Sequence, residues 1–295
     1  MKIALITPWE NAWIPHFRNS AERRGHQFIA CKTHAPTDSD AVIHGWATGT
    51  PSVKGAKNIV FLRRYELFEG GLTKIDWNRT DALICVNSWF KRFAESILAE
   101  NGVKVPVHLI YNAVDESKWT FEKRGPGKKV GMACFIHSKK NIPLALQILA
   151  ALPEGYELHI AGAVQDFCLA EYLSHSATTL GRVIHAYGQI PAGSLDKWWD
   201  GMNYCLSTSI SEGNPNNVIE AMAKGIKPIV HHWPGAEDQF QPWLFTGVQQ
   251  AVAQIMAEDY DSDAYRAWVR QHFSLTNIER VMDLIETPIQ EKAAA

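Results

Sequence analysis

The feature that most constrains the fold of this chain is a repeated alternation of short apolar runs with amphipathic stretches. KNIVFLRRYE at residues 57–66 and DALICVN at 81–87 have the length and the β-branched content of strands. SWFKRFAESILAENG at 88–102 starts at a capping Ser88, spaces its apolar side chains as a helix does and ends in Asn-Gly. Strands that alternate with helices predict an α/β fold, with a parallel sheet covered on both faces.

A charged stretch that contains Gly-Pro-Gly, DESKWTFEKRGPGKK, interrupts this pattern near residue 120. Such a composition is typical of a linker, and the alternation restarts after it with VGMACFI. The 295 residues are enough for two cores. We therefore expect two Rossmann-like domains with parallel sheets that face a central cleft, where ligands bind outside the carboxyl ends of the strands. The expected parts are an N-terminal domain (1–115), a linker (116–129), a C-terminal domain (130–275) and a helix and tail (276–295) that cross back to the first domain.

The composition indicates a soluble globular protein in a reducing compartment. No apolar run approaches the roughly 20 residues that span a bilayer. The apolar start of the chain is interrupted by Pro8 and Glu10, and it therefore predicts a first strand. The five cysteines lack CxxC spacing, and several lie in apolar strand-like runs. We expect a cytoplasmic protein, or one at the inner face of a membrane.

The charge differs between the two halves of the chain. Residues 1–115 carry 14 Lys and Arg against 11 Asp and Glu, a balance of +3, whereas residues 116–295 carry 15 against 20, a balance of −5. A balance of +3 suits an anionic acceptor or a lipid surface, or it is chance variation. It is too small to indicate a strong nucleic-acid interface.

The segment SEGNPNNVIEAMAKG at residues 211–225 carries two glutamates eight positions apart. It follows the strand-like run NYCLSTS, so Glu212 is expected at the carboxyl edge of the sheet. Gly213 permits a close approach of the backbone, Asn214 is a helix cap and Pro215 suits a first helical position. The helix start then directs its dipole at an anion such as a diphosphate, and Glu220 can accept two neighbouring hydroxyls.

This segment resembles the E-x7-E signature of retaining glycosyltransferases of the GT-B fold, in particular family 4. With the IKPIV that follows it, the resemblance includes the spacing, both glycines, both prolines (Pro215 and Pro228) and EAMA. It implies that Glu212 hydrogen-bonds the donor sugar, that Glu220 holds the nucleotide ribose and that the backbone at 213–216 contacts sugar and phosphate. The residues assigned in this way to sugar and phosphate are Gly213, Asn214, Pro215 and Asn216.

Further segments are similar to the same family. VHLIYNAVDESKW has Ala113 where the family has glycine. YGQIP implies that Tyr187, Gly188 and Ile190 face the nucleotide base. FIHSKKN implies that Lys140 binds the donor diphosphate, but the arginine that the family places nearby is missing. The sequence offers His137, Ser138 and Lys139 in its place.

The resemblance implies transfer of a sugar from a nucleoside-diphosphate sugar, of UDP or GDP type, with retained anomeric configuration. We expect Glu212, Lys140 and His44 to be the catalytic residues. No cofactor and no metal are expected. The two D-x-D patterns, at 38–40 and 261–263, precede a strand and an apparent helix, where caps or loop acids are the expected role.

The acceptor side is expected in the first domain, after its strands. His44, or alternatively the run from Arg63 to Glu66, takes the place of the histidine that relatives carry there, and the sequence does not decide between the two. The acceptor is a glycan, a lipid-linked saccharide or a small molecule. The residues expected on this side are Trp9, Glu10, Trp46, Arg63, Arg64, Tyr65 and Glu66.

Three alternative functions remain open at this point. A nucleotide-sugar 2-epimerase would share the architecture and use carboxyls such as Glu10 and Glu66. A non-catalytic sugar-nucleotide binding protein fits the missing arginine. A phage-type enzyme would glycosylate hydroxymethylated DNA bases. Nucleic acid is therefore a possible partner, but a less favoured one than a carbohydrate. The segment SWFKRFAESIL suits a peripheral membrane contact or a core helix equally, and the sequence does not give the oligomeric state.

Overall fold

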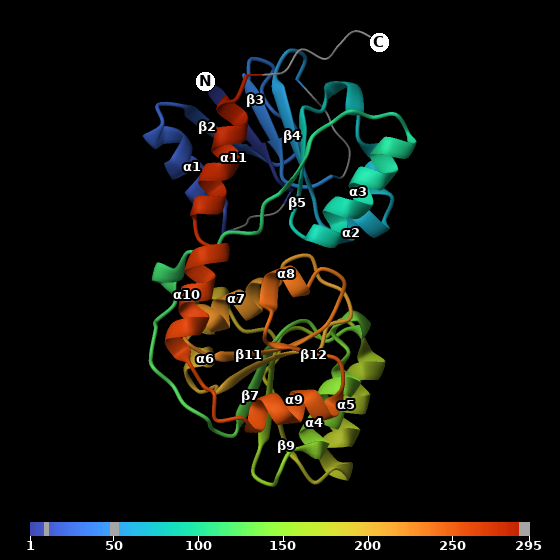
Figure 1. Ribbon diagram of the computed structural model, residues 1–295, viewed down its shortest axis with the longest axis vertical. Helices are drawn as coiled ribbons and strands as arrows, with labels where there is room; N and C mark the ends of the chain where they lie inside the picture. Colours follow the sequence, from blue (N-terminus) through green and yellow to red (C-terminus); the bar gives the residue numbers. More distant parts are fainter. Residues whose placement is uncertain (9–11, 48–52, 289–295) are drawn as a thin grey trace. The chain divides into compact units, whose positions relative to one another are not determined.

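The computed structural model describes residues 1–8, 12–47 and 53–288. The chain forms two compact units, one from Met1–Ala113 with Leu275–Ala295 and one from Val114–Ser274 (Figure 1). The expected linker at residues 116–129 groups with the second unit. There the Arg124 guanidinium donates to the carbonyl oxygens of Asp200, at 2.7 Å, and of Lys224, at 3.4 Å.

The sheet of the first unit has six parallel strands in the order β2-β1-β3-β4-β5-β6. Its central strands are buried on both faces, which explains their continuous apolar runs. The strand order reverses between β1 and β3, and the loops after these two strands mark the switch point of the sheet. The strands are β1 (Lys2–Ile6), β2 (Gln27–Cys31), β3 (Ala41–His44), β4 (Lys57–Leu62), β5 (Ala82–Cys85) and β6 (Val107–Leu109).

Helices cover both faces of this sheet. Ile59 and Phe61 of β4 pack in one apolar cluster with α1 (Ile14–Arg23) and α11 (Thr276–Glu286), whereas alternate residues of the same strand face α2 (Arg64–Phe68) and α3 (Ser88–Glu100). The predicted cap of α3 is off by one residue. Asn87 is the cap, because its Oδ1 accepts from the backbone N–H groups of residues 89 and 90. Two short 3-10 helices, η1 (Gly71–Lys74) and η2 (Trp77–Arg79), complete this side.

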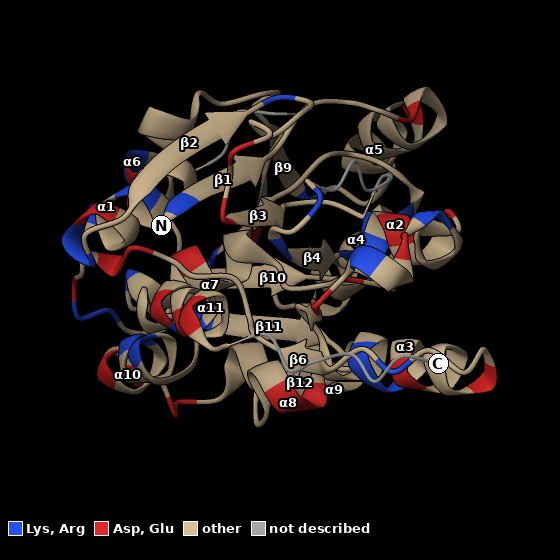
Figure 2. Ribbon diagram, turned by 90° about the horizontal axis from the view of Figure 1, so that it is seen from above, with Lys and Arg blue, Asp and Glu red and all other residues tan. Residues whose placement is uncertain are grey.

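Helix α11 returns the end of the described chain to the first unit. Val281 and Ile285 are buried in the core of that unit. The Arg24 guanidinium, next to the end of α1, pairs with Glu279 at 2.7 Å and with Asp283 at 2.8 Å. Figure 2 colours the acidic residues of α11 red and the basic ones of α1 blue. Apolar burial and ion pairs together therefore fix α11 on the first unit.

The sheet of the second unit also has six parallel strands, in the order β12-β11-β10-β7-β8-β9. Read from β9, this is the doubly wound order of Rossmann folds, with its switch point between β7 and β10. The strands are β7 (Lys129–Ala133), β8 (Glu157–Ala161), β9 (Val183–Ala186), β10 (Tyr204–Ser207), β11 (Lys227–His231) and β12 (Leu244–Phe245).

One face of the second sheet packs on α4 (Ile142–Ala151), α5 (Phe167–Thr179) and α9 (Val248–Met256). The other packs on α6 (Leu195–Asp200) and α7 (Asn216–Ala223), with α10 (Ser262–His272) against α7. α10 is capped by Asp261, one of the D-x-D acids. The short elements are η3 (Glu116–Lys118), η4 (Ser138–Lys140), η5 (Ala192–Ser194) and α8 (Glu237–Phe240).

Candidate functional site

The loops after β7 and β10 meet at the switch point of the second sheet. The two strands pair directly, with Tyr204 opposite Val130. Beyond them, Thr208 Oγ1 donates to the Lys140 carbonyl at 2.7 Å, and the Ile210 N–H donates to the Lys139 carbonyl at 3.0 Å. These two hydrogen bonds hold the lysine loop beside the start of the E-x7-E segment.

Glu212 lies between two ammonium groups. Lys140 Nζ is 2.6 Å from its Oε1, and Lys139 Nζ is 3.3 Å from its Oε2. The residue is 8% exposed. Burial by itself would raise the pKa of Glu212, but the two ammonium groups outweigh it and hold that pKa below its usual value. The carboxylate is therefore ionised, and it forms ion pairs with both lysines.

The backbone beside Glu212 is positioned by a residue that the sequence did not single out. Gln239 of α8 is fully buried. Its Nε2 donates to the Gly213 carbonyl at 2.9 Å, and its Oε1 accepts from Asn214 Nδ2 at 2.6 Å. Asn214 therefore does not cap α7 as predicted. The cap position is taken by Pro215, which has an extended backbone, and the helix begins at Asn216.

Glu220 lies in the middle of α7 and is partly buried. Burial raises the pKa of its carboxyl to about 7. Among the residues that the structure describes, this carboxyl has no hydrogen-bond or ion-pair partner. A desolvated acceptor in this state is suited to a ligand that brings hydroxyl donors.

The segment that was expected to replace the missing arginine forms the turn before α4. His137 Nδ1 accepts from the Lys139 N–H at 3.3 Å, so the imidazole caps η4. Asn141 follows in the left-handed conformation, with φ of 48°, which asparagine tolerates better than most residues. His137 therefore shapes the turn that carries Ser138 and the two lysines, and Lys139 is the second cation of the site.

The segment predicted to contact the base follows β9. Tyr187 is half exposed, and its hydroxyl lies 2.8 Å from His159 Nδ1. Gly188 has a φ of +66°, and its carbonyl accepts from the Gly162 N–H at 2.7 Å. Gly162 in turn permits the close approach of β8 to β7, because a Cβ there would lie 1.9 Å from the Cys134 carbonyl oxygen. Ile190 lies partly buried before η5.

In the first unit, His44 ends β3 inside the core. It is 2% exposed, and its Nε2 lies 3.1 Å from Asn58 Oδ1. Asn58 Nδ2 donates to a backbone carbonyl, so its Oδ1 is the atom that faces the ring and His44 Nε2–H is the donor. Burial lowers the pKa of His44, which keeps the imidazole neutral. This environment is that of a packed histidine.

Arg63 is the buried centre of the predicted acceptor side. Its guanidinium donates to the Gly45 carbonyl and to Asn112 Oδ1, each at 3.0 Å, and lies over the rings of Trp13 and Trp46, 3.8 and 5.1 Å from their centroids. Burial lowers the pKa of Arg63 to about 9, so it stays charged at neutral pH.

The rest of that run divides between core and surface. Glu66 is 2% exposed, and its Oε1 accepts from the Ala47 N–H at 3.1 Å. Burial raises the pKa of its carboxyl. Tyr65 is exposed, and Arg64 lies over the ring of Phe68. The predicted residues Trp9 and Glu10 lie outside the described residues.

Two doubly wound units, each with a six-stranded parallel sheet, define the GT-B fold of glycosyltransferases. The chain belongs to the family "Glycosyl transferases group 1", whose model matches residues 114–271. It is therefore a glycosyltransferase. This match contains the loops of Lys140 and Glu212, Gln239 and the whole of α7. No curated protein sequence gave a significant match to the chain.

Solved structures with the same fold are distant in sequence. Anabaena Alr3699/HepE, solved in complex with UDP and glucose, has a TM-score of 0.74 at 12% identity, over 98% of this chain and 100% of that one. The lipopolysaccharide outer core galactosyltransferase WaaB has a TM-score of 0.70 at 16% identity, over 97% and 99%. S. aureus TarM, whose mutant was solved with fondaparinux, α-GlcNAc-glycerol and UDP, has a TM-score of 0.66 at 16% identity. The match covers 80% of this chain and 52% of TarM.

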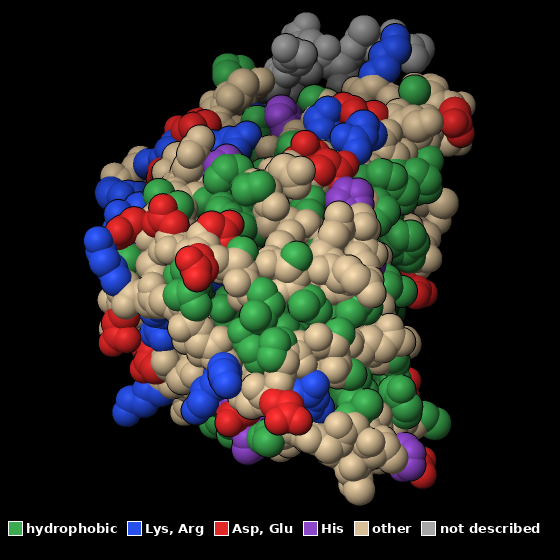
Figure 3. Space-filling model, turned by 60° about the horizontal axis from the view of Figure 1, so that its bottom comes forward, with side chains coloured by type: hydrophobic (Ala, Val, Ile, Leu, Met, Phe, Trp, Pro, Cys, Tyr) green, Lys and Arg blue, Asp and Glu red, His purple; other side chains and the backbone are tan. Residues whose placement is uncertain are grey.

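Two observations concern the expected partners. No helix within the described residues is both long and apolar enough to cross a membrane. On the face shown in Figure 3, basic and acidic side chains are interspersed, so that face does not present a continuous basic surface for a nucleic acid.

Proposed function

We propose that the chain is a retaining, metal-independent glycosyltransferase that moves a sugar from a nucleoside-diphosphate sugar to an acceptor hydroxyl. The observation that carries this proposal is the ionised Glu212 between the ammonium groups of Lys139 and Lys140, at the switch point of the second sheet. This is where doubly wound sheets bind ligands. The start of α7 adds the positive end of a helix dipole.

The two lysines supply the charge that the reaction requires. As the bond between the anomeric carbon and the phosphate oxygen breaks, negative charge grows on the departing diphosphate, and fixed cations stabilise it. Lys139 and Lys140 would take the roles of lysine and arginine in related sites, which is why no metal is needed. When the diphosphate engages the ammonium groups, the Glu212 carboxylate becomes available to a donor-sugar hydroxyl.

Retention follows from a front-face displacement. The acceptor oxygen bonds to the anomeric carbon on the face that the phosphate leaves, and the acceptor proton passes to the departing phosphate oxygen. Glu212 is held by two ammonium groups before the donor binds, and with the donor bound it serves to position the sugar. We assign His44 no part in this step, because it is buried against Asn58.

The nucleotide half of the donor is assigned to Glu220 and the segment after β9. The Glu220 carboxyl, which has no partner among the described residues, would accept the two ribose hydroxyls, and Tyr187 and Gly188 would contact the base. HepE and the TarM mutant were solved with UDP, which makes UDP-sugars the first donors to test and GDP-sugars the second. The acceptor is a glycan, a lipid-linked saccharide or a small molecule, recognised by the first unit through residues such as Arg64 and Tyr65.

The test is donor turnover by the purified protein with panels of UDP- and GDP-sugars, in the presence of EDTA. Saccharides, a lipid-linked saccharide and hydroxymethylated DNA serve as acceptors, and NMR gives the anomeric configuration of the product. Glu212→Gln and Lys140→Met should reduce turnover at least tenfold, whereas the exposed Glu171→Gln and Lys197→Met should match the wild type. Release of a 2-epimer, or binding without turnover of any donor, would replace the transferase by the corresponding alternative.

A further inference from the structure

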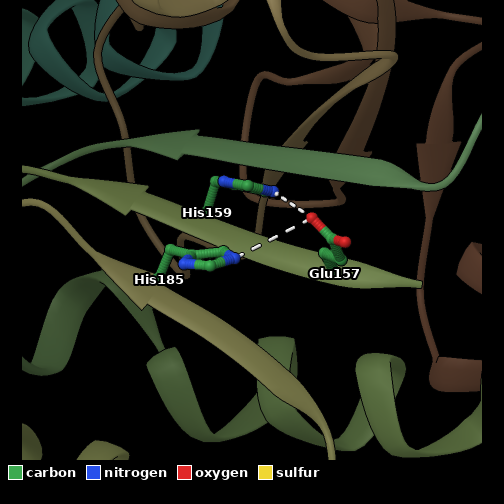
Figure 4. Close-up of side chains that lie close together, drawn as sticks. All are labelled: Glu157, His159 and His185. Carbon is green, nitrogen blue, oxygen red and sulfur yellow. Dashed lines mark hydrogen bonds and ion pairs between the residues drawn. The ribbon is translucent and has the colours of Figure 1, made fainter. Parts of the chain in front are cut away.

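Three side chains that the proposed reaction does not use meet on one face of the second sheet. Glu157 and His159 are two residues apart on β8, and His185 is the register partner of His159 on β9 (Figure 4). Glu157 Oε2 lies 3.0 Å from His159 Nε2 and 3.8 Å from His185 Nε2. All three donor atoms lie within 4.8 Å of one another. The set consists of two imidazoles and one carboxylate.

We propose that Glu157, His159 and His185 form a binding site for a transition-metal ion, with Zn²⁺ the expected occupant. Two histidines and one carboxylate with an open fourth position are a zinc ligand set. Ligand atoms about 2.0–2.1 Å from a tetrahedral metal lie about 3.4 Å apart, so the present donors need to move by no more than about 1.5 Å. The stacked rings of His159 and His185, with centroids 4.6 Å apart, already place both imidazoles on the same side of the sheet.

The ring of His159 is oriented for this role, and metal binding would move its proton from Nε2, where it is donated to the Glu157 carboxylate, to Nδ1, where the Tyr187 hydroxyl can accept it. His159 Nδ1 lies 2.8 Å from the Tyr187 hydroxyl, which leaves Nε2 directed at the Glu157 carboxylate. A second hydrogen-bond partner of this kind orients a metal-bound histidine and fixes which ring nitrogen binds. His159 itself is 4% exposed and therefore a rigid ligand.

Access and local charge are compatible with a cation. The side chains of His185 and Glu157 are 46% and 31% exposed, so an ion can enter from solvent and His185 can adjust. Lys129 of β7, the register partner of Glu157, is a positive charge on the neighbouring strand, and the Glu157 carboxylate offsets it. The ion would join β9, the last strand of the sheet, to β8 and would stabilise Tyr187 through His159. The three ligands lie on β8 and β9, whereas Glu212 and Lys140 lie in the loops after β10 and β7, so none of the ligands takes part in the proposed transfer. Tyr187, which the proposed function places at the nucleotide base, is shared by the two sites.

The experiment is a titration of the tag-free protein with Zn²⁺ against a chromophoric chelator, with Co²⁺ as a spectroscopic probe of the coordination. We expect one ion per chain. His185→Ala and Glu157→Gln should weaken binding at least tenfold, and Tyr187→Phe should weaken it by roughly 10-fold or more through loss of the hydrogen bond to His159 Nδ1. Zn²⁺ should also raise the melting temperature of the wild type and not that of His185→Ala.

Two matched variants separate this site from other ligands. His232 is equally exposed and lies 3.7 Å from Glu237, which makes His232→Ala a control for a histidine-carboxylate pair without the third ligand. Cys168→Ser removes an exposed thiol. Both should bind Zn²⁺ as the wild type does. The proposal is overturned if the wild type binds no stoichiometric Zn²⁺, or if His185→Ala binds it equally well while circular dichroism shows both to be folded.

Discussion

Lys140 Nζ lies 2.6 Å from Glu212 Oε1 and joins the loop after β7 to the loop after β10 at the switch point of the second sheet. The pair is almost completely removed from solvent. A pair of this kind responds strongly to the loss of one partner, because the remaining charge stays buried. In the proposed reaction the donor diphosphate competes with Glu212 for the same ammonium group.

Removal of that ammonium group should affect both stability and turnover. Lys140→Met leaves Glu212 with Lys139 alone, and we expect a loss of about 1.5–3 kcal/mol in the free energy of unfolding. Donor turnover should fall roughly 10- to 100-fold. In Lys140→Met/Glu212→Gln the destabilisation should be smaller than the sum of the single effects, which denaturant titrations of all four proteins measure. Additive effects would show that the two side chains are not coupled.

Glu212 should contribute to stability in a pH-dependent way. Because its pKa is lowered in the folded protein, its contribution is fully present above the unfolded value of about 4.3 and is lost as the pH falls through the folded pKa. Below pH of about 4.3 the wild type should therefore lose more unfolding free energy than Glu212→Gln does. The measurement is urea unfolding of both proteins between pH 3 and pH 7, at roughly half-unit steps. Parallel pH profiles would contradict the ion pair.

Glu220 should lower the stability of the folded protein as the pH rises, whereas Glu212 raises it. Its pKa of about 7 exceeds the unfolded value of about 4.3, so the carboxylate costs stability increasingly as the pH rises between the two and fully above pH 7. Glu220→Gln should thus be more stable than the wild type by about 1–3 kcal/mol at pH 8 and similar to it at pH 4 to 5. The same variant should bind the nucleotide at least tenfold more weakly. A variant that is less stable than the wild type at pH 8 would mean that Glu220 has a favourable partner in the apo protein.

His44 should be structural. His44→Ala removes the hydrogen bond to buried Asn58 and opens a cavity, for an expected loss of about 2–4 kcal/mol in unfolding free energy. Its kcat, measured at a temperature where the variant is folded, should stay within a few-fold of the wild type. A hundredfold loss of kcat with unchanged stability would restore the sequence-based expectation of a catalytic histidine.

Much of the fold could be predicted, because its signals are local. The buried strands are continuous apolar runs, and the turn residues of the E-x7-E segment fix a loop and a helix. The predictions were wrong where contacts between residues distant in the sequence determine the local structure. Asn214 bonds Gln239, which lies on a later helix, and Pro215 takes the cap position that was predicted for Asn214. Helix α5 was not predicted, since much of its apolar surface, including Phe167 and Tyr172, is exposed and gives little amphipathic pattern.

The candidate site, like the fold, could be predicted in part only. The assignment of Glu212 and Lys140 to one site came from family resemblance, and the structure gives its physical form as an ion pair. His44 was expected to be catalytic, and its burial could not be predicted because all four residues of β3 are buried and no alternation separates a core face from an exposed one. The E-x-H pattern of β8 was visible, but its meeting with His185 depends on the register of β9, which no local pattern specifies.

The most direct test of the donor site is the melting temperature of the wild type with UDP, GDP, ADP and CDP. We expect one of these, UDP or GDP, to raise the melting temperature. At about 100 times the Kd this corresponds to about 2.7 kcal/mol of stabilisation. The shift should be lost in Lys140→Met and reduced in Glu220→Gln, and it should persist in Lys197→Met. If no nucleoside diphosphate shifts the melting temperature of the folded wild type, Glu212, Lys140 and Glu220 do not form a donor site and the proposed function is wrong.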